Sequence, residues 1–163
     1  MKTSKFDAEV LTASDLQRLA VNLLARREHS RLEILQKLST KCDDIALVES
    51  VLDQLVAMGW QSDERYCSVF LRSRLHRGSG PLRLRQELKA KGICDHLIAA
   101  AFVEQDMDWF ECARTVALKK MLSLRNDPKW REKLYRFLTY RGFDSEQTRY
   151  ALEALQDGDH SDS

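Results

Sequence analysis

A short helical pattern recurs along this 163-residue chain at intervals of 50 residues. Its clearest copy spans residues 80–93, where Pro81 suits the first turn of a helix and Gly92 suits a left-handed stop. Three columns of residues repeat with this helix: Ile34, Leu84 and Leu134; Leu38, Leu88 and Leu138; Lys41, Lys91 and Arg141. The stop is glycine in the second and third copies but Cys42 in the first, where we expect a tighter, less regular helix end. Such regular recurrence predicts stacked repeats.

Helix-start signals divide the chain into nine predicted helices, in three sets of three. They begin at Ser14-x-x-Gln17, Ser30-x-x-Glu33, Asp43-Asp44, Ser62-Asp63-Glu64, Gly80-Pro81, Asp95, Asp108-x-x-Glu111, Asp127-Pro128 and Asp144-x-x-Gln147. The third helices of the sets also match, with the columns Leu52, Phe102, Leu152 and Val51, Ala101, Ala151. Only 6 Gly and 2 Pro interrupt the chain, and β-branched runs are lacking. The sequence therefore predicts an all-α fold of three tandem three-helix repeats of about 50 residues, forming an elongated, curved array.

The helix signals also predict where each repeat begins and ends. We expect a leader at 1–13, three-helix repeats at 14–59, 60–106 and 107–155, and an acidic disordered tail at 156–163. Trp60 and Trp109 lie near the junctions between these repeats, where large aromatic side chains are best explained as packing wedges.

Composition argues against a metal site, a disulfide framework and catalysis. The 4 cysteines are widely spaced, and the histidines lie at no metal-binding spacing, so reduced thiols and no metal are expected. Gly78-Ser79-Gly80 lacks the lysine of a phosphate loop, and the carboxylate pairs lie at helix starts, where capping explains them. No apolar run has the length of a signal peptide or a membrane span. We expect a soluble, cytoplasmic protein that is not an enzyme and needs no cofactor.

The near-neutral total charge of +1 conceals two basic bands. Residues 60–93 contain 8 basic and 3 acidic residues, and residues 119–141 contain 8 and 2. At 100° per residue, one side of the helix in the second band carries Lys129, Lys133, Arg136 and Tyr140. Such a stripe suits phosphate groups or an acidic protein surface, although by charge alone a solvated outer face explains it equally well. The presence of two bands favours a binding surface.

Four stretches are distinctive when taken together: Gly-Trp-Gln-Ser-Asp-Glu-Arg-Tyr at 59–66, Arg-Ser-Arg at 72–74, the helix at 80–93, and Lys-Leu-Tyr-Arg-Phe-Leu-Thr-Tyr-Arg-Gly-Phe at 133–143. The first three closely resemble the central signature of the RecX family of bacterial regulators of the RecA recombinase. The fourth resembles the signature of that family's third repeat, and the likeness covers residues 14–155.

The resemblance implies a monomeric partner of the RecA nucleoprotein filament, acting in DNA repair, recombination and the SOS response. Such a protein binds the filament groove, suppresses ATP hydrolysis, strand exchange and stimulated repressor self-cleavage, and favours filament disassembly. Direct contact with single- or double-stranded DNA is possible, but no membrane is implied. Charge, helical face and the matched motifs together predict these partner-binding residues: Arg72, Arg74, Arg83, Arg85, Lys89, Lys91, Lys129, Lys133, Arg136, Tyr140 and Arg141.

Two other functions fit the same sequence. Three-helix units with a basic second helix resemble helix-turn-helix modules, so the alternative is a stand-alone helical DNA-binding protein. A structural scaffold that binds no nucleic acid is the third possibility.

Overall fold

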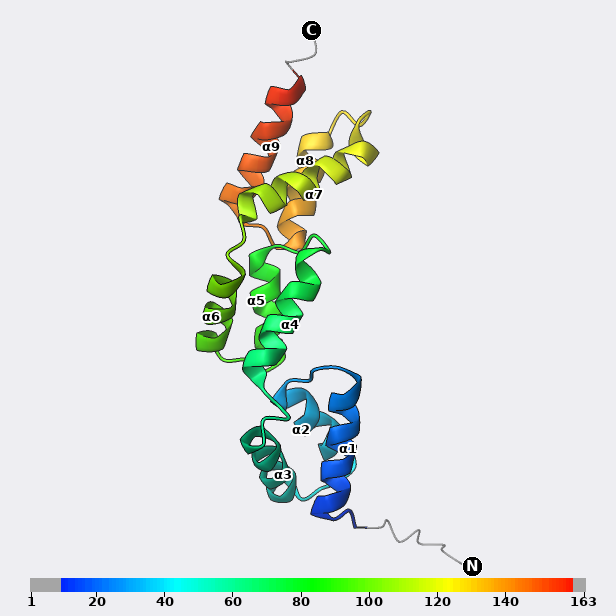
Figure 1. The fold of residues 1–163 in the computed structure, drawn as a ribbon. Helices are drawn as coiled ribbons and strands as arrows, with labels where there is room; N and C mark the ends of the chain where they lie inside the picture. Colours follow the sequence, from blue (N-terminus) through cyan, green and yellow to red (C-terminus); the bar gives the residue numbers. More distant parts are fainter. Residues whose placement is uncertain (1–9, 160–163) are drawn as a thin grey trace, which may run out of the picture. The chain divides into compact units, whose positions relative to one another are not determined.

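The computed structural model describes residues 10–159, which form nine α-helices and no strand (Figure 1). The helices are α1 (Ala13–Arg26), α2 (Arg31–Ser39), α3 (Ile45–Ala57), α4 (Asp63–Leu75), α5 (Pro81–Ala90), α6 (Asp95–Gln105), α7 (Trp109–Leu124), α8 (Trp130–Arg141) and α9 (Ser145–Asp159). The predicted all-α repeat fold is therefore confirmed for this part of the chain. Its contacts divide the chain after Tyr66 into two compact units.

The first unit contains α1, α2, α3 and the first turn of α4. The three complete helices pack on one another around an apolar core made of Leu16, Ala20, Ile34, Leu38, Val48, Val51, Leu52 and Leu55. The predicted box at Ser30 and Glu33 caps α2, and the Asp44 carboxylate accepts a hydrogen bond from the Leu47 N–H at the start of α3. Local capping and apolar spacing therefore account for all three helices.

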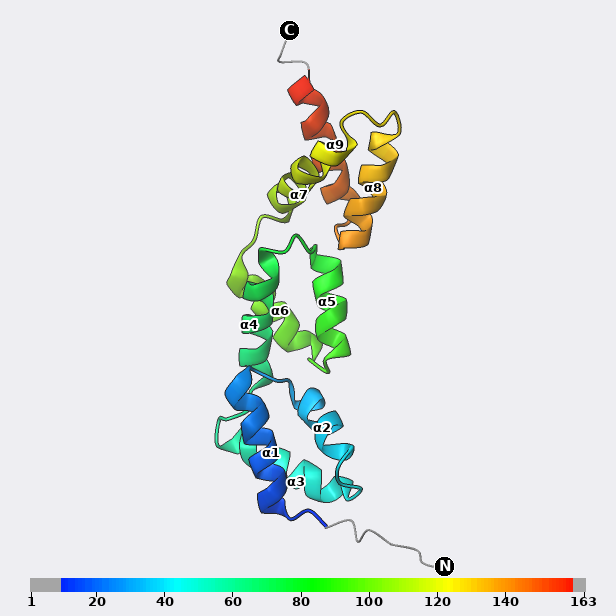
Figure 2. The same ribbon diagram turned by 90° about the vertical axis from the view of Figure 1, so that its right-hand side faces the viewer.

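The second unit contains the rest of α4 and α5 to α9 (Figure 2). In the C-terminal half of this unit, α7 packs on both α8 and α9 around a core made of Ala113, Ala117, Leu124, Leu134, Leu138, Phe143, Ala151 and Leu152. Trp109, at the start of α7, stacks against Phe102 of α6 with ring centroids 5.8 Å apart. Trp109 is thus the packing wedge that the sequence predicted, whereas Trp60 is 47% exposed.

The 50-residue columns are columns of buried side chains. Ile34, Leu84 and Leu134 are all 0% exposed, and the other apolar columns are buried as well. The ends of α5 and α8 also match, because each closes with the same pair of backbone bonds: Gly92 to Lys89 and Ile93 to Leu88, then Gly142 to Thr139 and Phe143 to Leu138. Both glycines have positive φ.

The first repeat ends its second helix differently from the other two, although not with the tighter turn that the sequence predicted. The N–H groups of Lys41 and Cys42 both donate to the Leu38 carbonyl at 3.0 Å. The Lys41 bond spans three residues, but so does the bond from the Lys91 N–H to the Leu88 carbonyl in the second repeat, so the end of α2 is not tighter than the end of α5. The difference lies at the stop position: Cys42 donates to the carbonyl four residues back, whereas Gly92 and Gly142 donate to the carbonyl three residues back. A non-glycine residue at the stop position therefore changes the way the helix ends.

The start of α1 corrects one prediction. Thr12, not Ser14, is the N-cap, and its hydroxyl accepts from the Asp15 N–H while the Asp15 carboxylate accepts from the Thr12 N–H. This choice places Leu11 just before the cap and Leu16 at the fourth helical position, where both join the apolar core. That arrangement is a hydrophobic staple, which a cap at Ser14 could not form.

Two further helix boundaries differ from those predicted. Asp127 and Pro128 form a turn before α8, closed by the bond from the Trp130 N–H to the Asp127 carbonyl, so the helix starts at Trp130. Helix α9 does not fade near Leu155 but continues to Asp159, which makes the start of the predicted tail helical. Residues 1–9 of the leader and 160–163 of the tail lie outside the described residues.

Candidate partner-binding surface at the junction of α5 and α8

The C-terminal end of α8 meets the N-terminal end of α5, and both views of the ribbon show these ends together (Figure 2). The Gly80 N–H donates to the Arg141 carbonyl at 2.7 Å, and the Leu82 N–H donates to the Gly142 carbonyl at 3.0 Å. The first N–H groups of a helix and its last carbonyls have no partner within their own helix. Each helix end here supplies the partner that the other lacks, and the two helix dipoles meet with opposite partial charges.

Two glycines allow this close approach. A Cβ atom on Gly80 would lie 2.3 Å from the carbonyl carbon of Gly142, and one on Gly142 would lie 2.4 Å from the Cβ atom of Arg83. Gly142 also has a φ of 98°. Any side chain at either position would therefore force the second and third repeats apart.

Arg83 and Tyr140 face each other across this junction. The Arg83 guanidinium lies 5.3 Å from the centroid of the Tyr140 ring, and its Nε atom donates to the Glu87 carboxylate at 3.3 Å. Tyr140 is nonetheless 75% exposed. Beside the pair is a hollow of about 350 Å³ lined by Leu82, Arg83, Gln86, Thr139, Tyr140, Gly142 and Phe143.

Arg141, by contrast, is engaged within the junction. Its guanidinium donates to the Arg77 carbonyl at 3.0 Å and lies 5.1 Å from the centroid of the Phe137 ring. These contacts tie α8 to the turn between α4 and α5. Arg141 therefore contributes a contact between the two repeats.

The predicted basic residues of α5 are divided between opposite flanks of the helix. Arg83 points toward α8, whereas the Arg85 guanidinium lies 4.2 Å from the ring centroid of Phe102 on α6. Lys89, one turn after Arg85, pairs with Asp95 at 3.4 Å. Arg85 thus packs against α6, while Lys89 is exposed and pairs only with the exposed Asp95, and the structure does not bring either residue together with Arg83.

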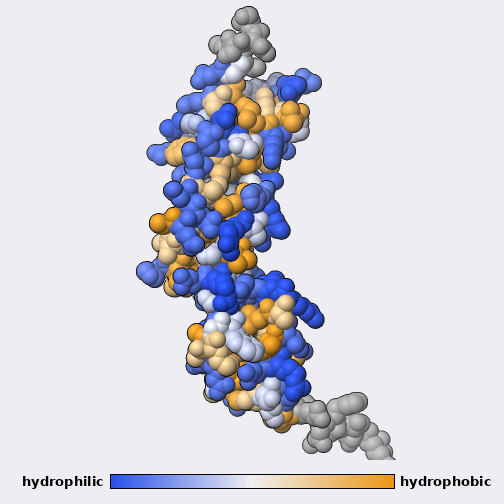
Figure 3. Space-filling model, in the orientation of Figure 1, coloured by the Kyte–Doolittle hydropathy of each residue, from blue (hydrophilic) through white to orange (hydrophobic). Residues whose placement is uncertain are grey.

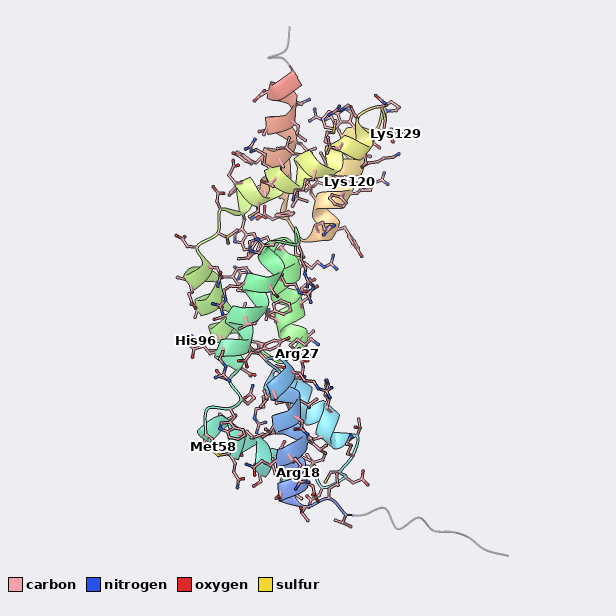
Figure 4. All side chains as sticks on the ribbon, turned by 45° about the vertical axis from the view of Figure 1, so that its right-hand side comes forward. Arg18, Arg27, Met58, His96, Lys120 and Lys129 are labelled. Carbon is pink, nitrogen blue, oxygen red and sulfur yellow. The ribbon has the colours of Figure 1, made fainter. Side chains whose placement is uncertain are left out.

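The outer side of α8 carries the stripe that the sequence predicted. Lys129, Lys133, Arg136 and Tyr140 are all exposed, while Leu134 and Leu138 are buried. Figure 4 shows Lys129 at the turn between α7 and α8. Lys133 pairs with Asp127, whose carboxyl pKa this ammonium lowers, and Arg136 lies 3.9 Å from Glu132. The pair of Arg136 with Glu132 is exposed on both sides and therefore weak, whereas Asp127 is half-buried and holds Lys133 more closely.

The remaining predicted partner-binding residues do not belong to the exposed stripe on α8. Arg72 is exposed on α4, and the Arg74 guanidinium lies 4.9 Å from the ring centroid of Phe70 on the same helix. Lys91 is partly exposed at the C-terminal cap of α5.

Sequence reasoning missed the uncharged residues of the junction. Leu82 is 49% exposed because it lies on the side of α5 opposite the buried Leu84 and Leu88. A leucine off the apolar stripe was the signal that could have identified it. Gln86 and Thr139, which also line the hollow, carry no such signal.

Within the described residues, no cluster of His, Cys, Asp and Glu could hold a metal ion. None of the four cysteines forms a disulfide with another cysteine among the described residues. No helix in residues 10–159 is both long and apolar enough to cross a membrane. On the face shown in Figure 3, apolar side chains are scattered among polar ones.

Comparison with known proteins decides the family. The family model of the second three-helix domain of RecX matches residues 62–101, and that of the third three-helix domain matches residues 106–152. A protein of Chromohalobacter salexigens named regulatory protein RecX is 43% identical over 136 residues, covering 82% of this chain and 88% of the relative. The chain belongs to the RecX family.

Other RecX proteins agree with this assignment. The regulatory protein RecX of Vibrio vulnificus is 40% identical over 134 residues, covering 82% of this chain and 88% of its own. A crystal structure of regulatory protein RecX superposes with a TM-score of 0.74 at 26% identity, covering 86% of this chain and 73% of that one. RecX from Lactobacillus salivarius, at 22% identity and a TM-score of 0.76, shows the same fold over 88% of this chain and 96% of its own.

Both matched RecX domains lie in the part of the chain that carries the junction. Pro81, Leu84, Leu88 and Arg83 fall within the second domain, and the whole exposed stripe of α8 falls within the third. The RecX relatives are named as regulatory proteins, not as enzymes.

Proposed function

We propose that this protein is an inhibitor of RecA that binds in the groove of the RecA–DNA filament. It suppresses ATP hydrolysis, strand exchange and coprotease activity, and it favours filament disassembly. In this proposal the protein acts as a cytoplasmic monomer without a cofactor or a catalytic step of its own. The observation that carries the proposal is the exposed stripe of Lys129, Lys133 and Arg136 on the third RecX domain.

The junction of α5 and α8 supports groove binding for a mechanical reason. The paired helix ends hold two three-helix repeats in one fixed arrangement, so side chains on both can contact a filament at the same time. Several modest contacts made from a single fixed body add up, because later contacts form at high effective concentration. A protein bound across neighbouring RecA subunits would favour one geometry of the filament and oppose the motions of turnover.

A charge-reversal pair on α8 tests the contact surface. Lys133→Glu with Arg136→Glu changes two exposed side chains on the side opposite Leu134 and Leu138, so the thermal midpoint should stay near that of the parent. Cosedimentation with RecA filaments on single-stranded DNA should then weaken strongly, because like charges would face the acidic partner. The same reversal at Arg85 and Lys89 is a poorer test, since Arg85 packs on Phe102.

The matched control changes the same net charge elsewhere in the second unit. Lys119 on α7 and Arg149 on α9 are exposed and lie off the α8 stripe. The variant Lys119→Glu with Arg149→Glu should cosediment like the parent. If the α8 pair cosediments as well as this control, the stripe is solvated and the filament contact lies elsewhere.

The alternative, a stand-alone DNA-binding protein, is favoured by the basic second helices of the three-helix units. It predicts tight binding to duplex DNA without RecA, with a log–log salt slope of about −0.9 per phosphate neutralised. The filament-binding proposal predicts that tight binding to duplex DNA in the same buffer requires RecA. The two functions therefore separate in one titration with and without RecA.

A further inference from the structure

Tyr140 is an exposed aromatic side chain that the fold does not need. The residues at the same place in the other two repeats, 50 and 100 positions earlier, are Ala90 and Thr40, and both are exposed. The helix in each repeat therefore forms and packs without an aromatic ring at this position. The ring is 75% exposed to water on the third repeat alone, so it is accessible to a ligand.

The junction holds this ring in place. Arg83 lies against it at 5.3 Å, and Arg83 is in turn held by Glu87. The helices that carry the two residues are fixed to each other by the Gly80 and Leu82 backbone bonds. Tyr140 is therefore pre-organised, and its large exposed area leaves room for a second planar group.

The surroundings of the ring match those of a single-strand binding site. Arg136, Lys133 and Lys129 follow Tyr140 back along α8 at intervals of about one helical turn, roughly 5.4 Å each. The hollow on the other side offers the apolar side chain of Leu82 with the amide of Gln86 and the hydroxyl of Thr139. Proteins that bind single strands combine a cationic track for the backbone with aromatic rings on which bases stack.

We propose that Tyr140, backed by Arg83, stacks on a nucleobase of single-stranded DNA while Arg136 and Lys133 contact the neighbouring phosphates. This inference rests on the proposed function only in placing that strand inside the RecA filament. It assigns the junction to the DNA, and not to the surface of RecA. Duplex DNA is a poorer ligand because its bases are already stacked on one another, and an acidic peptide would not need the ring.

The test separates base stacking from charge. A fluorescent oligothymidylate is titrated with the parent at low salt and compared with an oligonucleotide of equal length and charge made of abasic sites. Tyr140→Ala should weaken binding of the oligothymidylate by about 5- to 150-fold, the range of one stacked base. Tyr140→Phe keeps the ring and should bind within about twofold of the parent, whereas the abasic strand should not distinguish the three proteins.

The control variant is Tyr135→Ala, because Tyr135 is 44% exposed on another side of the same helix. This substitution should leave both affinities unchanged. The inference is overturned if Tyr140→Ala weakens both strands equally or neither, or if the parent binds neither strand. Inhibition of the RecA ATPase by the same samples is measured separately: a parent that inhibits RecA but fails these titrations refutes the stacking site alone.

Discussion

The backbone N–H of Gly80 donates a hydrogen bond to the backbone carbonyl of Arg141, 61 positions further along the chain, at 2.7 Å. This bond joins the N-terminal end of α5, the second helix of the second repeat, to the C-terminal end of α8, the second helix of the third repeat. Tandem repeats are stable mainly through such contacts between neighbours. In this protein the contact is made by helix ends, which leaves the outer sides of α5 and α8 free to carry Arg83 and Tyr140.

The close approach of α5 and α8 at the junction predicts that a single methyl group added at Gly142 destabilises the protein. Gly142→Ala adds a Cβ atom 2.4 Å from that of Arg83, at a residue whose φ is 98°. Gly59 has a similar positive φ of 75° but open space around it, so Gly59→Ala measures the backbone term alone, about 1 kcal/mol. We expect Gly142→Ala to cost about 1–3 kcal/mol more in urea denaturation, owing to overpacking. Equal losses of unfolding free energy in the two variants would mean that the junction accommodates the added Cβ atom at no cost.

The buried columns predict the energetic core of each repeat. Leu88 is 0% exposed on α5, and Leu88→Ala should lower the free energy of unfolding by about 2–5 kcal/mol. Leu82 on the same helix is 49% exposed, and Leu82→Ala should change it by less than about 0.5 kcal/mol. Far-UV circular dichroism during urea denaturation measures both. Similar losses of unfolding free energy in the two variants would contradict the assignment of Leu88 to the buried face of α5 and of Leu82 to its exposed face.

His29 predicts a pH dependence of stability in the first unit. The side chain is buried, with Nδ1 3.0 Å from the Arg27 carbonyl and with Arg27, Glu33 and Lys37 nearby, and burial lowers its pKa below the ordinary 6.5. As the pH falls through about 6.5, the unfolded chain takes up a proton that the folded chain does not, so stability is lost. The thermal midpoint should therefore decline between about pH 7.5 and pH 5.5.

Two variants check the source of that decline. His29→Asn keeps a donor near the Arg27 carbonyl and should flatten the pH dependence, although its midpoint at neutral pH should be lower. His96→Gln changes an exposed histidine (Figure 4) and should preserve the slope of the parent. A slope that survives His29→Asn would assign the effect to other groups.

The lack of disulfides among the described cysteines predicts that thermal stability is indifferent to redox conditions and to chelators. Cys67 is buried and Cys94 is exposed, and the described residues form no metal cluster. Thermal unfolding should therefore be the same with reducing agent, with chelator and with neither. A midpoint that falls on adding chelator would reveal a metal site.

Local physics made much of this fold predictable from the sequence. The box at Ser30 and Glu33, the N1 proline at Pro81 and the reciprocal bonds of Asp144 with Gln147 depend only on residues within four positions of each other. Thr12 shows where this reasoning fails. Two overlapping capping signals competed there, and the contact of Leu11 with the core decided between them.

The candidate surface was also predictable only in part, because some of its contacts depend on residues that are distant in the sequence. The helical face of Lys133, Arg136 and Tyr140 follows from spacing alone and is exposed as predicted. What each flank of α5 contacts depends on other helices, so the contact of Arg85 with Phe102 could not be read from the sequence. Gly80 looked like a simple helix start, yet it is required by Gly142 in another repeat.

The central claim is that the protein inhibits RecA by binding its filament, and the rate of DNA-dependent ATP hydrolysis by RecA measures it directly. With far fewer copies of this protein than of RecA, we expect the rate to fall, because each bound copy affects a run of filament subunits. The Lys133→Glu, Arg136→Glu variant should require far more protein for the same inhibition, and the Lys119→Glu, Arg149→Glu control should not. A hydrolysis rate that stays unchanged even when the parent protein is present in equal amount to RecA would contradict the account.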